Sequence, residues 1–226
     1  MARAATYDAT RARVEDYFDR TATQTWERLT SDAPVSKIRQ TVRAGRDRMR
    51  ATMLSCLPDD LTGARILDAG CGTGQMTIEL AARGAEVVAV DISPSLVDIA
   101  AGRLPSESAG CVTFMAGDMT DPALGSFDHV LAMDSLIYYT ATDIGRILTQ
   151  LSPRVTGSTV FTVAPKTPFL MAFWGMGQLF PRSDRSPTMV PHSLNNLNRH
   201  APHKIAQIDR ITSGFYISSC LEMSAT

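Results

Sequence analysis

The sequence offers little material for a disulfide framework, a metal cluster or a membrane span. Its 226 residues include four cysteines, at positions 56, 71, 111 and 220, and none has the spacing of a metal-ligand set. This usage predicts a reducing compartment. The longest apolar stretch, residues 168–180, is shorter than the roughly 20 residues of a membrane span, and the N-terminus lacks a signal peptide's apolar core. We expect a cytoplasmic protein, with peripheral attachment to a membrane left open.

An excess of charge of one sign is also missing. The formal net charge is −1, so bulk charge gives no argument for nucleic acid as a partner. One stretch departs from this balance: residues 35–50 contain a single acidic residue, Asp47, and six basic ones, namely Lys37, Arg39, Arg43, Arg46, Arg48 and Arg50. Such a run is typical of a solvated helix face. The alternative is a local site for an anion or a membrane surface.

Apolar residues are plentiful, at 44% of the chain, which suits one domain with a substantial core. Residues 10–58 have a helical pattern that Pro58 ends. From residue 64 onward, short apolar runs alternate with helical segments. Strands are predicted within 64–70, 86–91, 111–118, 127–134 and 158–165, helices within 74–84, 93–104 and 141–151, and two further strands within 203–223 with a turn near Ser213 and Gly214.

This alternation predicts an α/β fold, in which a mostly parallel sheet is covered by helices on both faces. We expect residues 1–58 to form an N-terminal helical lid or arm and residues 59–226 to form the core. A substrate-binding insertion is expected at about 166–190, where aromatic residues stand beside glycines and prolines.

A glycine-rich turn follows the first predicted strand in "LDAGCGTGQ", residues 67–75. Ligands of such sheets bind beyond the C-terminal ends of the strands. The dinucleotide fingerprint G-x-G-x-x-G would need a glycine at position 75, which is Gln75; the spacing here is Gly70-x-Gly72-x-Gly74. Asp91 ends the second strand, where a carboxylate can accept hydrogen bonds from both hydroxyls of a ribose.

The spacing after Asp68 resembles motif I of the class I S-adenosylmethionine-dependent methyltransferases, and Gly117-Asp118-Met119 resembles their adenine-binding position. The resemblance implies a Rossmann-like methyltransferase fold and S-adenosylmethionine as cosubstrate. The implied cofactor-binding residues are Asp68, Gly70, Gly72, Asp91, Ile92, Asp118, Met119 and Met133. The segment "AMDSLIYYT" (132–140) stands where methyltransferases of nucleic-acid bases often carry Asn/Asp-Pro-Pro-Tyr, which argues against base methylation.

The flanking segments resemble the magnesium-protoporphyrin O-methyltransferases over nearly the whole chain. "YFDRTATQTWERL" (17–29) shares Tyr17-Phe18, Thr21 and Trp26 with their entry segment, and residues 42–49, 163–170, 177–187 and 211–223 are similar to further elements of that family. Two positions depart from it. Leu29-Thr30-Ser31 stands where many relatives have Ile-Tyr-Gly, and Tyr138-Tyr139 stands where many have His-Tyr.

This resemblance implies methylation of one propionate of magnesium protoporphyrin IX, in bacteriochlorophyll biosynthesis. The candidate catalytic residues are Tyr17, Tyr138 and Tyr139, and the candidate substrate-binding residues are Trp26, Phe169, Phe173 and Trp174. No protein-bound metal is expected. Expected partners are the porphyrin and the magnesium chelatase subunit that delivers it, with contact to a photosynthetic membrane left open. Three alternatives stay open: another small-molecule O-methyltransferase, a nucleotide-binding protein or reductase, and a porphyrin carrier without activity.

Overall fold

A seven-stranded sheet organises the computed structural model, which describes residues 7–19, 36–108, 110–168, 170–171 and 187–224. Its strand order is β3-β2-β1-β4-β5-β7-β6. The strands are β1 (Arg65–Ala69), β2 (Glu86–Asp91), β3 (Val112–Ala116), β4 (His129–Ala132), β5 (Ser158–Val163), β6 (Ile205–Ser213) and β7 (Tyr216–Ser224). β1 to β5 are parallel, and β7 runs antiparallel to both β5 and β6. The predicted α/β fold is confirmed, as is the strand–turn–strand tail.

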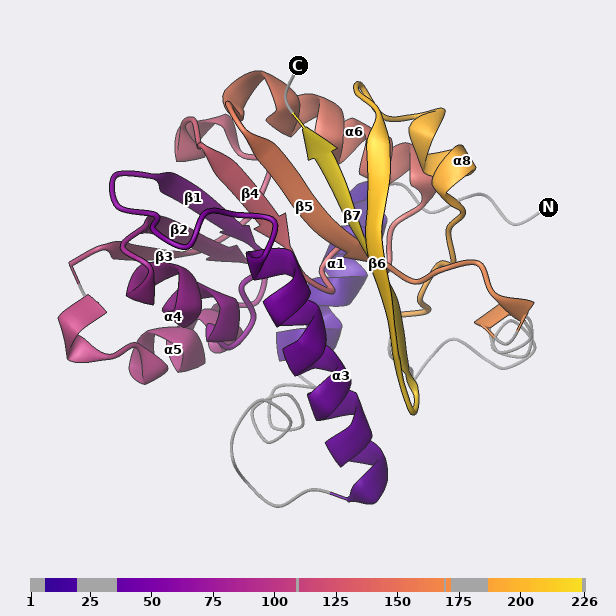
Figure 1. Cartoon of the computed structure of the whole chain (residues 1–226), viewed down its shortest axis with the longest axis horizontal. Coiled ribbons are helices and arrows are strands. Elements are labelled where there is room, and N and C mark those ends of the chain that lie inside the picture. The colour runs from indigo at the N-terminus through magenta and orange to yellow at the C-terminus, as the bar shows by residue number, and fades with distance from the viewer. Residues whose placement is uncertain (1–6, 20–35, 109, 169, 172–186, 225–226) are drawn as a thin grey trace.

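Six α-helices lie among the described residues (Figure 1). They are α1 (Tyr7–Tyr17), α3 (Lys37–Leu54), α4 (Gln75–Ala82), α5 (Pro94–Arg103), α6 (Ala141–Leu151) and α8 (Leu194–Asn198). Short 3-10 turns at Ser106–Ser108, Pro122–Leu124 and Ser152–Arg154 precede β3, β4 and β5. α5 begins as its sequence predicts, because the Ser93 hydroxyl caps the Leu96 N–H and Pro94 occupies the first turn. None of these helices is long and apolar enough to cross a bilayer.

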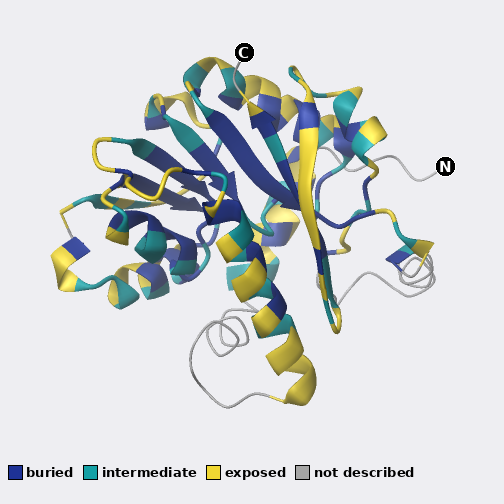
Figure 2. Cartoon of the chain, in the orientation of Figure 1, coloured by how far each residue is buried: buried dark blue, intermediate teal, exposed yellow. Residues whose placement is uncertain are grey.

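Alternate residues of the central strands pack against helices on opposite faces of the sheet. Ile66 of β1 contributes to a core shared with α3 and α4, whereas its neighbour Leu67 contributes to a core shared with α1, α6 and α8. β5 is buried along its whole length. Figure 2 shows this buried centre, with exposed residues gathered at the N-terminal end of α3 and along β6.

The expected lid of residues 1–58 is not a single unit. Met49, Met53 and Leu54 of α3 are at most 1% exposed and belong to the core beneath the sheet. The helical pattern from residue 37 onward was therefore that of a core helix, and residue 58 does not divide a lid from a core. α1 stands apart from this core and contributes Tyr7 to the opposite one.

Candidate active site

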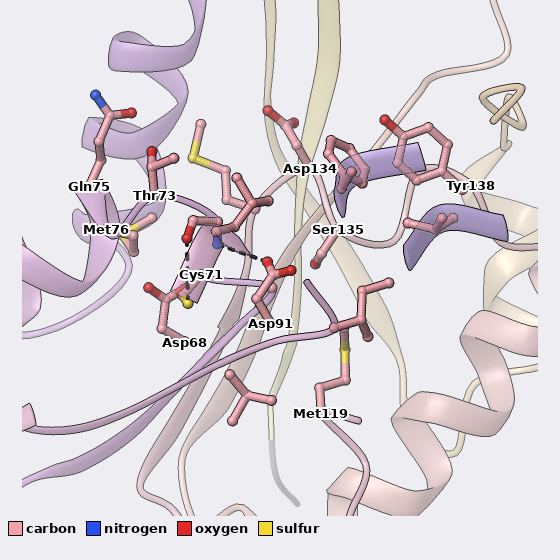
Figure 3. A pocket seen from close by; sticks show the side chains of 18 of the residues that line it. Asp68, Cys71, Thr73, Gln75, Met76, Asp91, Met119, Asp134, Ser135 and Tyr138 are labelled. Carbon is pink, nitrogen blue, oxygen red and sulfur yellow. Dashed lines mark hydrogen bonds between the residues drawn. The ribbon is translucent and has the colours of Figure 1, made fainter. Parts of the chain in front are cut away.

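A pocket opens where β1, β2 and β4 end, at the edge of the sheet that parallel strands share. Gly70 and Gly72 form part of its floor, and its space, including the part open to solvent, is about 930 Å³. In Figure 3, Thr73, Gln75 and Met76 follow one wall, Asp134, Ser135 and Tyr138 follow the opposite wall, and Asp91 and Met119 lie between them.

Two glycines of the turn have backbone conformations that other residues rarely adopt. Gly70 has φ +84° and Gly72 has φ +53°, in the left-handed region that favours glycine. A Cβ added to Gly70 would lie 2.3 Å from the Cβ of Ser135, whose hydroxyl donates to the Ala69 carbonyl at 2.8 Å. Gly70 therefore allows the turn to pass close beside the loop after β4.

Two buried carboxylates support this turn. Asp68 is 1% exposed and accepts a hydrogen bond from the Thr77 hydroxyl at 2.5 Å, and burial raises its pKa to about 7. Asp91 accepts the N–H of Gly72 on one oxygen at 2.9 Å (Figure 3). Its other oxygen accepts the N–H of Ser93, also at 2.9 Å. Burial also raises the pKa of Asp91. Because two backbone donors fix its carboxylate, Asp91 can present its other lone pairs to the pocket in one orientation.

The side chain of Asp118 contacts α1 and does not line this pocket. Its carboxylate accepts hydrogen bonds from the Tyr7 hydroxyl at 3.0 Å and from the Arg11 guanidinium at 2.8 Å. It also caps Thr120. Asp118 was expected to bind adenine, but its neighbours Gly117 and Met119 line the pocket in its place. Sequence alone gave no signal that a helix 107 residues earlier would take this carboxylate.

Aromatic residues of α1, and Phe18 directly after it, contact the tyrosines of the pocket wall. The rings of Tyr7 and Tyr139 stack with centroids 5.3 Å apart, and Phe18 contacts both Tyr17, at 5.2 Å, and Tyr138, at 6.1 Å. Phe18, Tyr138 and Tyr139 line the pocket. Burial raises the pKa of both Tyr138 and Tyr139 above the ordinary phenol range, so their hydroxyls stay protonated at neutral pH.

Comparison with known proteins places this site in a family. A model of the magnesium-protoporphyrin IX methyltransferase C-terminus matches residues 132–225, and a general methyltransferase domain matches residues 66–156. The magnesium-protoporphyrin O-methyltransferase of Rhodobacter capsulatus is 67% identical over 96% of this chain and 97% of its own length. This chain belongs to the magnesium-protoporphyrin O-methyltransferase family.

Solved structures agree with this assignment. The magnesium protoporphyrin IX methyltransferase of Synechocystis with bound SAH superimposes with a TM-score of 0.81 at 27% identity, and the match covers 96% of this chain and all of that one. The same protein with bound SAM gives a TM-score of 0.77. A shorter similarity, 43% over 34% of this chain, links it to a ubiquinone biosynthesis O-methyltransferase of Xanthomonas oryzae.

Most of the predicted cofactor residues of this methyltransferase come together in the pocket. Its lining includes Asp68, Gly70, Gly72, Asp91, Ile92, Met119 and Met133. Of the predicted catalytic residues, Tyr138 and Tyr139 line it, and Tyr17 reaches it through Phe18. The predicted substrate-binding residues Trp26, Phe169, Phe173 and Trp174 lie outside the described residues.

Two arginines of the methyltransferase pocket belong to the basic stretch 35–50, for which a local anion site was left open but no single residue was selected. Arg46 and Arg50, one turn apart on α3, both line the pocket. Arg50 pairs with Asp47 at 2.9 Å and with Glu79 of α4, while Arg46 pairs with Asp134 at 2.8 Å. The sequence signal for these two residues was the run of basic residues at 35–50. Arg46 and Arg50 lie one helical turn apart and so share one face of α3, whereas Lys37, Arg39 and Arg48 are exposed.

Proposed function

We propose that this protein transfers a methyl group from S-adenosylmethionine to a propionate carboxylate of magnesium protoporphyrin IX, giving the monomethyl ester and S-adenosylhomocysteine. The observation that carries the proposal is the pocket itself: its glycine turn and its fixed Asp91 carboxylate suit a nucleoside, in a chain of this family. The sulfonium cosubstrate and the porphyrin are the ligands that the names of its relatives indicate.

The ends of the pocket suit the two ends of the cosubstrate. Asp91 is placed to accept hydrogen bonds from the ribose hydroxyls, and Gly117 and Met119 line the space beside it for the adenine. The cosubstrate's own carboxylate then lies near the N-terminal end of α4 and Arg50, because that end of a helix and a guanidinium both favour an anion.

The methyl transfer requires the oxygen, methyl carbon and sulfur atoms to be aligned, but it does not require a general base. A propionate with the pKa of an ordinary carboxyl, about 4.3, is already ionised at neutral pH. One of its oxygens forms a bond to the methyl carbon while the carbon–sulfur bond breaks and its electron pair goes to sulfur. The negative and positive charges cancel, so exclusion of water favours the transition state over the separated ions. Holding the three atoms in line contributes roughly 7–11 kcal/mol.

Tyr138 and Tyr139 suit this reaction as neutral groups. Because burial keeps both phenols protonated, they are poor candidates for a general base. We propose that they act as walls and hydrogen-bond donors of a dry site, to which Tyr17 adds a further hydroxyl and Phe18 an apolar wall. The histidine that many relatives carry at position 138 is dispensable on this account.

The decisive experiment incubates the purified protein with S-adenosylmethionine and magnesium protoporphyrin IX, followed by mass spectrometry of the porphyrin. We expect a gain of one methylene. Binding of porphyrin without that gain would indicate a carrier, and methylation of a phenolic quinone precursor in its place would indicate another O-methyltransferase. Thermal stabilisation by NAD but not by S-adenosylhomocysteine would contradict the proposal at its first step.

We also propose a peripheral membrane contact through the tip formed by the first turns of α3 and the β6–β7 turn. The Ser213 hydroxyl donates to the Thr41 carbonyl at 2.8 Å, which joins these two elements. Ile38 is 56% exposed and Phe215 is 59% exposed, and Lys37, the residue before Ile38, is exposed as well. Apolar side chains beside basic ones suit an anionic lipid surface. Delivery of the porphyrin by a magnesium chelatase subunit is part of the same proposal, with no surface assigned to it.

Sedimentation with lipid vesicles tests the membrane contact. Binding to vesicles of anionic lipid is expected to exceed binding to zwitterionic ones and to fall several-fold when Ile38 and Phe215 are both replaced by serine. Met115→Ser, which removes an exposed apolar side chain from the opposite edge of the sheet, is the matched control. Equal sedimentation of all three proteins would refute this contact.

A further inference from the structure

The lining of the pocket contains two cationic side chains, Arg46 and Arg50, against three carboxylates, Asp68, Asp91 and Asp134. The proposed reaction brings two more carboxylates to the same space, namely that of the cosubstrate and the porphyrin propionate that receives the methyl group. We infer that Arg46 binds the propionate carboxylate that receives the methyl group, and that Asp134 positions Arg46 for this task. The inference rests on the proposed function and goes beyond it by naming the acceptor subsite.

Arg46 and Arg50 form ion pairs with different residues, which indicates that they serve different ligands. Arg50 is paired with Asp47 of its own helix and with Glu79 of α4, so it belongs to the wall that Gln75 and Met76 follow. Arg46 is paired with Asp134, which lies on the opposite wall beside Ser135 and Tyr138 (Figure 3). That wall faces the acceptor, because the first one holds the cosubstrate's carboxylate.

Asp134 is held more firmly than an ordinary loop residue. One carboxylate oxygen accepts from Arg46, and the other accepts from the hydroxyls of Tyr216 at 3.0 Å and Thr162 at 3.2 Å. The N–H of Asp134 donates to the Thr162 hydroxyl at 2.7 Å. Among the described residues, Asp134 is the one non-glycine with positive φ, at +56°. Such a conformation persists where the surroundings fix it, and residues held in this way cluster at functional sites.

Close packing of α3 against the sheet buries the Arg46–Asp134 ion pair. A Cβ at Gly45 would lie 2.7 Å from the Tyr216 ring, so the glycine before Arg46 lets the helix lie against β7. The side chains of Arg46 and Asp134 are consequently only 15% and 9% exposed. An ion pair this deep has already lost much of its water, which strengthens its interaction with a further charge.

A guanidinium suits a substrate carboxylate in this position. It carries five N–H donors in a planar fork, enough for two carboxylates at once. Arg46 would hold one oxygen of the propionate and leave the other to attack the methyl carbon. The negative charge of Asp134 offsets that of the guanidinium, so the bound carboxylate keeps its nucleophilic character.

The test compares two porphyrins that differ at the carboxylates alone. Dissociation constants of magnesium protoporphyrin IX and of its dimethyl ester are measured with S-adenosylhomocysteine bound. We expect the natural chain to prefer the acid, and Arg46→Met to reduce that preference by about 10- to 100-fold, the scale for one charge-assisted hydrogen bond. The affinity for S-adenosylhomocysteine should stay unchanged. Arg48→Met, on the exposed face of the same helix, is the matched control and should keep the full preference.

Two further variants keep the test decisive. Arg46→Lys leaves a cation beside Asp134 if Arg46→Met fails to fold, and it should raise the KM for the porphyrin several-fold without changing that for S-adenosylmethionine. Asp134→Asn, which keeps its shape but not its charge, should lower the acid preference as well. An unchanged preference in the Arg46 variants that fold, in a protein that methylates the porphyrin, would overturn the inference. Absence of methylation by the natural chain would instead overturn the proposed function.

Discussion

Replacing Gly70 by alanine tests whether the glycine turn is shaped by its neighbours. The new Cβ would lie 2.3 Å from the Cβ of Ser135, in a residue whose φ is +84°. Gly72→Ala is the matched control, because that residue has φ +53° but no atom within 4 Å of its added Cβ. Both glycines line the same pocket, so the two variants differ mainly in the collision with Ser135.

The two costs can be estimated separately. A left-handed conformation costs a non-glycine residue roughly 1–2 kcal/mol, and both variants carry this cost. Overpacking adds typically about 1–3 kcal/mol, and only Gly70→Ala carries that. The expected loss of unfolding free energy is therefore about 2–5 kcal/mol for Gly70→Ala and about 1–2 kcal/mol for Gly72→Ala.

A second substitution isolates the collision. Ser135→Gly removes the clashing Cβ, and by itself costs about 1 kcal/mol for the hydrogen bond to the Ala69 carbonyl. Combined with Gly70→Ala it should recover the overpacking energy, giving a coupling of about 1–3 kcal/mol in a double-mutant cycle. Urea unfolding of the four proteins measures it. If the two substitutions are simply additive, or if Gly72→Ala is as destabilising as Gly70→Ala, the reasoning from the Ser135 contact is wrong.

Three further outcomes follow from the carboxylates and phenols of the site. Asp91→Ala should weaken binding of S-adenosylhomocysteine by about 1–3 kcal/mol in a calorimetric titration, whereas Asp98→Ala, an exposed acid on α5, should leave it unchanged. The single-turnover rate should be flat from about pH 6.5 to 9, since an ionised propionate has a pKa near 4.3; a tenfold rise per pH unit would require a base. Asp68 has a pKa of about 7 when folded and about 3.9 when unfolded. The folded state therefore holds a proton that the unfolded state releases, and stability is lost as pH rises from about 4 to 7. Relative to Asp68→Asn, the natural chain should lose roughly 2–3 kcal/mol between pH 5 and pH 8, and equal pH profiles of the two proteins would contradict the raised pKa.

The sequence was most informative where the structure is set by neighbouring residues. The strands, the glycine turn and the Ser93 cap depend on short patterns of apolar residues, glycines and hydroxyls, and the structure confirms them. The end of β2 at Asp91 placed the ribose-binding candidate at the pocket, because parallel strands end at a common edge.

The remainder depends on contacts between distant parts of the chain. Arg46, Asp134 and Tyr216 have no local pattern in common, yet they meet in one cluster. Asp118 is engaged by Tyr7 and Arg11 of α1, a contact that no motif near residue 118 announces. The helical period of α3 was readable, but whether its apolar stripe meets a core or a moving lid depends on β6 and β7, which lie far along the chain.

The position of β7 between β5 and β6 has a consequence for synthesis on the ribosome. β6 leaves the ribosome before β7, but within the described part of the chain β7 is its only strand partner. Until residues 216–224 emerge, the sheet therefore ends at β5, whose six residues are all buried in the finished protein. A nascent chain at that stage displays an apolar, unpaired strand edge of the kind that aggregates or recruits chaperones. The arrival of β7 covers this edge and brings Tyr216 to Asp134, so the chain completes its sheet and the proposed acceptor subsite in the same step.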